Sequence, residues 1–266
     1  MFNCVTLVYE CSSLGCYRWF AKRFLHPDVV SIYDYIFLWD EDLGVENFNP
    51  ERYLKIVKSV GLEISQPALD HNSTEIHHKI TLRSKTKKFH RRVYINRGHK
   101  RCSNTSSDPP CTGFVEGMAP VFSKAAWLCT WNLIQNDLVH GWGMDMKLGY
   151  CAQGDRTKNV GIVDSEYILH QGIQTLGESV PEKKKTARDV GTRIRRQSTW
   201  ELQTFKERWS KAVEEDIKWI DPSSSSSMTK RKSNGNNRRL RRGSSSSHRV
   251  KHKRSQETSR TTTTHK

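Results

Sequence analysis

Three acidic residues stand where a predicted strand ends. Asp40, Glu41 and Asp42 follow the apolar run 35–39, which has the length and composition of a buried strand. Ligands of open α/β sheets bind beyond the carboxyl ends of the strands, and carboxylates there can hold a hard cation that neutralises a diphosphate. Since residues i and i+2 of an extended segment point the same way, Asp40 and Asp42 can converge on one ion. The alternative is an acidic loop that merely ends the strand.

A second candidate group lies at 141–145, where two glycines flank Trp142 and Asp145 follows shortly after. Glycine permits tight backbone turns. Trp142 offers a flat apolar surface that suits a sugar ring, and Asp145 could act as general base toward an acceptor hydroxyl. The alternative is a loop that ends a helix and packs its tryptophan.

The third candidate is His170, which ends an apolar stretch. A single histidine is commonly a hydrogen-bonded structural residue, so a ligand role requires that it meets Asp40 and Asp42 in space. Two carboxylates and one imidazole would suit Mn²⁺ better than Ca²⁺. The sequence contains no P-loop, no Gly-x-Ser-x-Gly and no His-Glu-x-x-His motif.

Local patterns predict the elements that would position these residues. Asn49 as N-cap, Pro50 in the first turn and Gly61 after the last turn predict a helix over about 50–59. Short apolar runs predict further strands from residue 64, at 160–163 and at 167–169.

Two more expectations concern the middle and the end of the chain. The alternating segments 77–82 and 91–95 predict an exposed hairpin, linked by the basic run 83–88. A helix that carries tryptophans at helical spacing should begin after Ser123, and residues 198–201 resemble a capping box that opens a last amphipathic helix.

Most of the positive charge lies in the C-terminal tail. The formal net charge of the 266 residues is +16, and residues 222–266 contribute +12 through thirteen Lys and Arg against one Glu. Because this tail has few apolar residues to offset its ordering entropy, we expect it to be disordered. It could bind nucleic acid or be a solvated extension without function. The preceding part has no basic-aromatic motif, which argues against nucleic acid as its partner.

The sequence also bears on the compartment. No apolar run approaches the ~18 residues that span a bilayer, and no clear signal peptide is visible. Of the seven cysteines, Cys102 and Cys111 flank a polar loop and would close a short disulfide in an oxidising compartment. Cys129 and Cys151 lie in apolar surroundings and are expected to be buried.

Five blocks of the sequence resemble a plant protein family, the domain of unknown function 707 family. The blocks are YIFLWDED at 35–42, FVEGMAPVF at 114–122, NDLVHGWGMD at 136–145, KLGYC at 147–151 and HQGIQTLG at 170–177. The resemblance covers about residues 19–177. Members are often labelled lysine-ketoglutarate reductase trans-splicing related, although nothing in these residues indicates a reductase or a splicing factor.

The family in turn resembles the GT-A glycosyltransferases. This resemblance implies an α/β fold with a Rossmann-like mixed sheet flanked by helices, in which a DxD-type motif after a strand holds Mn²⁺ and the diphosphate of a nucleotide sugar. By position, Asp40 and Asp42 would be metal ligands, with His170 as a third. The resemblance assigns the remaining roles to Asp145 as base and to Glu116 and Trp142 on the acceptor side.

These inferences define an expected organisation. It comprises an atypical segment at 1–18, the GT-A-like domain at 19–177, a charged linker with an amphipathic helix at 178–221, and the basic tail at 222–266. Relatives carry a membrane anchor and further N-terminal strands, and they suggest a Golgi membrane. Since neither feature is visible in this chain, we expect a domain truncated at its N-terminus.

The expected function is the metal-dependent transfer of a sugar from a nucleotide-sugar donor to a glycan or another hydroxyl acceptor. Truncation at the N-terminus is one way in which this chain could have lost that activity. One alternative is a non-catalytic relative that binds glycan or protein through Trp142 and the predicted hairpin. The other is a nucleic-acid-associated protein that acts through its tail.

Overall fold

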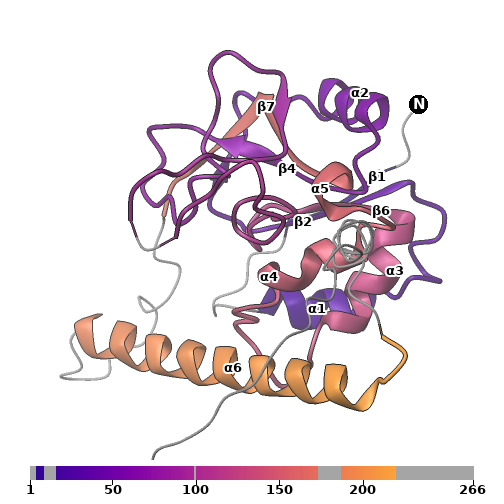
Figure 1. The fold of residues 1–266 in the computed structure, drawn as a ribbon, viewed down its shortest axis with the longest axis vertical. Coiled ribbons are helices and arrows are strands. Elements are labelled where there is room, and N and C mark those ends of the chain that lie inside the picture. Colours follow the sequence, from indigo (N-terminus) through magenta and orange to yellow (C-terminus); the bar gives the residue numbers. More distant parts are fainter. Residues whose placement is uncertain (1–3, 9–15, 99, 173–186, 220–266) are drawn as a thin grey trace, which may run out of the picture.

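The computed structural model describes residues 4–8, 16–98, 100–172 and 187–219. Its centre is a mixed β-sheet in the order β1-β2-β6-β4-β7-β3, with β5 paired to β7 (Figure 1). The strands are β1 Cys4–Val8, β2 Tyr35–Trp39, β3 Leu43–Gly44, β4 Ile64–Leu69, β5 Phe89–His90, β6 Val121–Ser123 and β7 Val160–His170. This arrangement confirms the predicted mixed α/β class.

Four strands of the sheet run in the same direction. β1 is parallel to β2, and β4 is parallel to β7. β6 is antiparallel to both β2 and β4, so β2 and β4 also run the same way. The carboxyl ends of β2, β4 and β7 therefore meet at one edge of the sheet, where ligands bind in open α/β folds.

Helices cover both faces of the sheet. They are α1 Cys16–Phe24, α2 Pro50–Val60, α3 Lys124–Leu133, α4 Asp145–Leu148, α5 Arg156–Asn159 and α6 Ala187–Glu215, with a 3₁₀ turn at Gly149–Cys151. Figure 1 shows α2 on one side of the sheet and α1, α3, α4 and α6 on the other.

The two faces bury separate hydrophobic cores, as the alternation along β2 shows. Ile36 and Leu38 belong to the core under α1 and α3, whereas Phe37 and Trp39 belong to the core under α2. All four side chains are buried. A run of apolar residues without polar alternation is what a strand covered on both faces requires.

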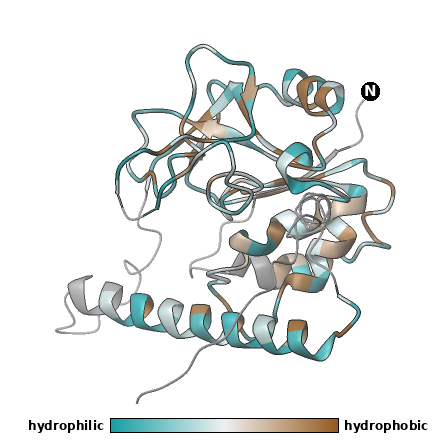
Figure 2. Cartoon of the chain, in the orientation of Figure 1, coloured by the Kyte–Doolittle hydropathy of each residue, from teal (hydrophilic) through white to brown (hydrophobic). Residues whose placement is uncertain are grey.

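Helix α2 forms for the local reasons seen in the sequence. The side chain of Asn49 accepts a hydrogen bond from the backbone N–H of Arg52 at 2.9 Å, and Pro50 occupies the first turn. Gly61 ends the helix with φ +68°, a conformation that glycine adopts at little cost. Figure 2 shows brown and teal stretches alternating along α2, the pattern of a helix with one buried face.

The predicted hairpin of 77–82 and 91–95 is wrong. The two segments do not pair with each other, and β5 instead pairs antiparallel with β7. Beyond β5, isolated bridges join Arg92 to Thr112 and Ile95 to Cys102. β5 lies against the long strand β7. Its pairing with β7 replaces the pairing between 77–82 and 91–95 that the alternating sequence predicts.

Other boundaries differ as well. Residues 160–170 form one strand with a register shift against β4 after Pro67, not two separate strands. Helix α6 begins at Ala187, and the hydroxyl of Ser198 donates to the carbonyl of Ile194 inside it, so 198–201 is not a capping box. Ser123 does cap α3, accepting from the backbone N–H of Ala126.

The ends of the chain contribute one unexpected element. The segment 1–18, which shows no periodicity in sequence, contains the strand β1 beside β2 and the start of α1. The basic tail 222–266, expected to be disordered, lies outside the described residues. Among the residues that are described, no helix is both long and apolar enough to cross a bilayer.

Candidate functional site

Asp42 and His170 meet at the carboxyl edge of the sheet. Their contact joins His170 Nε2 and Asp42 Oδ2 at 3.2 Å. It follows from strand register, because β3 begins directly after Asp42 and pairs Leu43 with His170. The backbone N–H of Gln171 also donates to the carbonyl of Asp42 at 3.0 Å. The sheet therefore fixes the position of both side chains.

The His170 ring is oriented from its other side. Its Nδ1–H donates to the carbonyl of Glu75 at 3.2 Å, and the backbone N–H of His170 donates to the hydroxyl of Ser73 at 3.1 Å. Since a carbonyl can only accept, Nδ1 carries a proton and Nε2 faces Asp42. A backbone acceptor on one imidazole nitrogen is the usual support for a metal-ligating nitrogen on the other.

The surroundings of His170 favour a second proton on its ring. The hydrogen bond to Asp42 raises the pKa of His170 to about 9, although burial lowers it. The Glu75 carbonyl and the charges of Asp42 and Asp40 raise this pKa further. Asp40 therefore lies within electrostatic reach of the imidazole. Its backbone N–H donates to the carbonyl of Met118 at 2.8 Å. This hydrogen bond continues the pairing of β2 with the chain that leads into β6.

The donor set fits a divalent cation in chemistry, and in part in geometry. The 3.2 Å between Asp42 and His170 is close to the roughly 3 Å that separates neighbouring ligands in an octahedral site with bonds near 2.1 Å. The side chains of Asp42 and His170 are 14% and 10% exposed, so only a small part of each faces solvent. Within the described residues, however, no three His, Cys, Asp or Glu side chains form a ready-made metal cluster. Of the three predicted ligands, Asp42 and His170 are therefore in contact, and Asp40 lies within electrostatic reach of His170.

Glu116 is buried and lies within electrostatic reach of His170. Its backbone N–H donates to the side-chain oxygen of Gln66, a fully buried residue of β4, at 2.8 Å. Neither carboxylate oxygen of Glu116 forms a hydrogen bond of normal geometry with the described residues. Burial raises the pKa of Glu116 to about 7, and Asp145 raises it further, while Thr81 and His170 lower it. Near neutral pH this side chain can therefore either donate or accept a hydrogen bond.

Asp145 opens the short helix α4, where its Oδ1 accepts the backbone N–H of Met146 at 2.8 Å. Its charge acts on Glu116 and also on His78. His78 packs its ring edge-on against Phe114, and burial lowers the pKa of His78. A neutral imidazole therefore lies near Asp145, the predicted base. The sequence did not indicate this, because His77 and His78 stand together in a polar stretch.

Trp142 stands at the tip of the loop that leads into α4. Gly141 and Gly143 both adopt positive φ, +57° and +89°, which confirms that the two glycines allow the turn. The Trp142 side chain is 45% exposed, so it is not packed into a core as the alternative proposed. An exposed indole next to an acidic residue suits contact with a sugar.

Helix α6 holds this loop from outside. Glu201 is fully buried and accepts from the backbone N–H of His140 at 2.7 Å, and it also pairs with the His140 ring at 3.0 Å. Leu202 lies so close to Gly143 that a Cβ there would stand 2.5 Å from its Cδ1. Phe205 packs beside Gly141 and Met144. Glu201 could not be recognised from sequence as part of the site, because its partner His140 is distant in the chain.

The structure thus gathers five of the six predicted site residues into one electrostatic cluster. Asp40 and Asp42 act on His170, and His170 and Asp145 act on Glu116. Trp142 lies three residues before Asp145 on the adjoining loop. Gln66, His78 and Glu201 are additions that the sequence did not reveal.

Among the described residues, four cysteines form two disulfides, Cys102–Cys111 and Cys129–Cys151. The first was expected for an oxidising compartment, whereas the second was expected only to be a buried pair. The second joins α3 to the 3₁₀ turn that follows α4, so it ties the segment after Asp145 to the helical layer.

Comparison with known proteins decides the family. The sequence model of a family described as "Protein of unknown function (DUF707)" matches residues 13–215. The chain belongs to the DUF707 family. The match extends to both sides of the 19–177 range and includes α6, which here contacts the candidate site.

Other comparisons add little to the DUF707 match. No curated protein matches the chain in sequence. Among solved structures, the crystal structure of A197 from STIV is similar with a TM-score of 0.31 and 11% identity, covering 70% of this chain and 99% of that chain.

Proposed function

We propose that this DUF707 protein is a metal-dependent glycosyltransferase-like protein of GT-A type, which transfers a sugar from a nucleotide-sugar donor to a hydroxyl acceptor. The observation that carries the proposal is the Asp42–His170 contact at the carboxyl edge of the sheet, with Asp40 in electrostatic reach. Two carboxylates and an imidazole at this edge are a donor set that suits Mn²⁺.

Each group has a distinct part in this proposal. Asp42, His170 and Asp40 would hold the ion, which when bound neutralises negative charge on the donor diphosphate. The Glu75 carbonyl keeps the His170 ring turned toward Asp42. The ion would supply the positive charge that the diphosphate requires, so no lysine or arginine is needed beside Asp42 and His170.

The acceptor would enter from the side of α4. Asp145 would take the proton from the attacking hydroxyl, and Trp142 would support the sugar ring by contact with its exposed face. Glu116, whose pKa burial raises to about 7, would exchange a hydrogen bond with a substrate hydroxyl after a small rearrangement. In this proposal Asp42 would act toward the donor and Asp145 toward the acceptor.

The two disulfides support a place in the secretory pathway, with the Golgi as the proposed compartment. Disulfides persist in oxidising compartments and are rare in the cytosol. Both pairs here lie in the described domain, one of them beside the acceptor segment.

A non-catalytic glycan-binding role is the second candidate, and the exposed Trp142 favours it independently of any metal. Donor binding separates the two. The transferase proposal predicts that nucleotide-sugar binding requires Mn²⁺ and is lost in Asp40→Asn plus Asp42→Asn. It also predicts that Asp145→Asn still binds donor but transfers no sugar. Donor binding that is unchanged without metal would contradict the proposed site, and glycan binding without donor binding would favour the second candidate.

A further inference from the structure

The segment from 76 to 107, here called the basic segment, has an unusual charge. It contains ten Lys and Arg and no Asp or Glu. Residues 1–221 together carry about +4, so the rest of that part carries about −6. The positive charge of the folded part is therefore concentrated in one segment between β4 and β6, which forms the purple loops in Figure 1.

Most of this charge faces solvent. Seven of the ten basic side chains are exposed: Lys79, Lys85, Lys87, Lys88, Arg97, Lys100 and Arg101. None of the seven is among the ion pairs that the described residues form. The acids closest to the segment already have partners, since Asp164 pairs with His90, Asp70 with Arg83, and Asp108 with Arg156.

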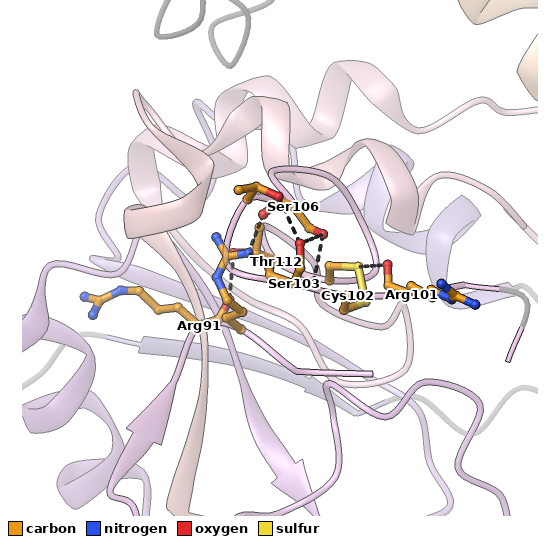
Figure 3. The surroundings of a disulfide bond; sticks show 9 residues. Arg91, Arg101, Cys102, Ser103, Ser106 and Thr112 are labelled. Atoms are coloured by element: carbon orange, nitrogen blue, oxygen red, sulfur yellow. Dashed lines mark hydrogen bonds between the residues drawn. A yellow bond between two sulfur atoms is a disulfide. The ribbon is translucent and has the colours of Figure 1, made fainter. Parts of the chain in front are cut away.

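The exposed charges sit on an anchored backbone. The carbonyl of Lys88 accepts backbone N–H groups from Asp164 at 2.8 Å and Ser165 at 3.2 Å, which fixes the turn 85–88 on β7. The second group, around 97–101, lies in a loop closed by the Ile95–Cys102 bridge, and the Cys102–Cys111 disulfide holds the end of this loop. Figure 3 shows the Arg101 side chain extending away from this disulfide.

The segment begins at the candidate acceptor side. His78, near its start, packs on Phe114 and lies within electrostatic reach of Asp145. Tyr94, between the two groups of basic residues, is 58% exposed. The segment thus holds exposed basic side chains and an exposed aromatic ring, and near its start a histidine in electrostatic reach of Asp145.

We infer that the basic segment binds an acidic glycan, a polymer whose sugars carry carboxylate or sulfate groups. Repeated negative charges would meet the exposed lysines and arginines, and a sugar ring could lie on Tyr94. That this glycan is also the acceptor rests on the proposed function, whereas the binding itself does not. Nucleic acid fits less well, because the segment carries a disulfide and disulfides indicate an oxidising compartment.

The test is lysine footprinting on the full chain, without metal or donor. Acetylation of each lysine is followed by mass spectrometry in the presence of polygalacturonate, with fully methyl-esterified polygalacturonate as the uncharged match. We expect protection of Lys85, Lys87 and Lys88 by the acidic polymer alone. Lys55 and Lys206, exposed residues on α2 and α6, are internal controls that should react equally in all samples.

A variant then measures the contribution of the turn. Lys85→Glu, Lys87→Glu and Lys88→Glu together should lower affinity for polygalacturonate about tenfold or more at low salt. Lys55→Glu plus Lys206→Glu should change it less than twofold. These exposed changes leave both cores intact.

Three results would overturn the inference. They are protection confined to lysines of the 222–266 tail, equal protection by the methyl-esterified polymer, and protection of the turn by duplex DNA or anionic vesicles but not by polygalacturonate. The transferase proposal fails separately, through loss of Mn²⁺-dependent donor binding. Each claim can therefore be rejected while the other stands.

Discussion

The Nε2 of His170 lies 3.2 Å from the Oδ2 of Asp42, although the two residues belong to opposite ends of the domain sequence. Their approach follows from the pairing of β3 with β7, which aligns Leu43 with His170. A carboxylate and an imidazole held by one sheet register can respond together to a proton or to a metal ion. The predictions below test this pair and the elements around it.

Mn²⁺ binding should release a proton and strengthen as the pH rises. The pKa of His170 is raised to about 9, so at pH 7 the ion must displace a proton from Nε2. Affinity should fall up to about tenfold for each pH unit below 9. Calorimetry in two buffers of different ionisation enthalpy measures the released proton. The His170→Gln variant is the control and should lose both the affinity and the pH dependence; equal proton release by it would contradict this view of His170.

Glu116→Gln should stabilise the fold at high pH and not at low pH. Burial raises the pKa of Glu116 to about 7, so the unfolded chain ionises before the folded one and stability falls between about pH 4.5 and 7. A shift of this size corresponds to roughly 3 kcal/mol as an upper figure. Urea unfolding at pH 5 and pH 8 should show a gain for the variant only at pH 8. The exposed change Glu214→Gln should show no such pH dependence, and an equal effect at both pH values would contradict the assignment.

Gly143→Ala should loosen α6 from the loop that precedes α4. The new Cβ would lie 2.5 Å from Leu202 at a backbone φ of +89°, so we expect a loss of roughly 1–3 kcal/mol in the free energy of unfolding. Gly98→Ala is a matched control, because its φ is +103° but nothing lies within 4 Å of the new Cβ. Adding Leu202→Ala to Gly143→Ala should recover part of the loss. If Gly98→Ala costs as much as Gly143→Ala, the contact with α6 is not the cause.

The Cys129–Cys151 disulfide should stabilise the packing of α3 against the 3₁₀ turn after α4. Cys129→Ala plus Cys151→Ala should lower the free energy of unfolding by about 2–4 kcal/mol, since the bridge closes a loop with a sequence separation of 22. Removing Cys102–Cys111, with a separation of 9, should cost less. Denaturant unfolding of oxidised protein measures both. Alkylation of Cys129 and Cys151 in unreduced, unfolded protein would show that the bridge does not form.

Local chemistry allowed parts of the fold to be predicted. The strand before Asp40 and the helix between Asn49 and Gly61 depend on neighbouring residues, so their signals lie within one short window. The hairpin at 77–95 failed because β5 pairs with β7, a partner far along the chain. Likewise Ser198 has the composition of a cap, but α6 begins at Ala187 and the Ser198 hydroxyl donates to the carbonyl of Ile194 one turn earlier.

The site was predicted in its residue types but not in its arrangement. Asp42 and His170 could be named from motifs, whereas their contact depends on the register of β3 and β7. The roles of Gln66 and Glu201 arise from packing between distant elements, Glu116 with β4 and His140 with α6. No window of sequence contains both partners of these contacts.

A titration of Mn²⁺ into the full chain, followed by UDP-sugars and GDP-sugars, tests the central claim most directly. Wild-type protein is compared with Asp42→Asn and with Asp137→Asn, a change of an exposed acid that pairs with Arg208 on α6. The account predicts that wild type and Asp137→Asn bind Mn²⁺ and then a nucleotide sugar, while Asp42→Asn binds neither. Mn²⁺ affinity that is unchanged in Asp42→Asn would contradict it.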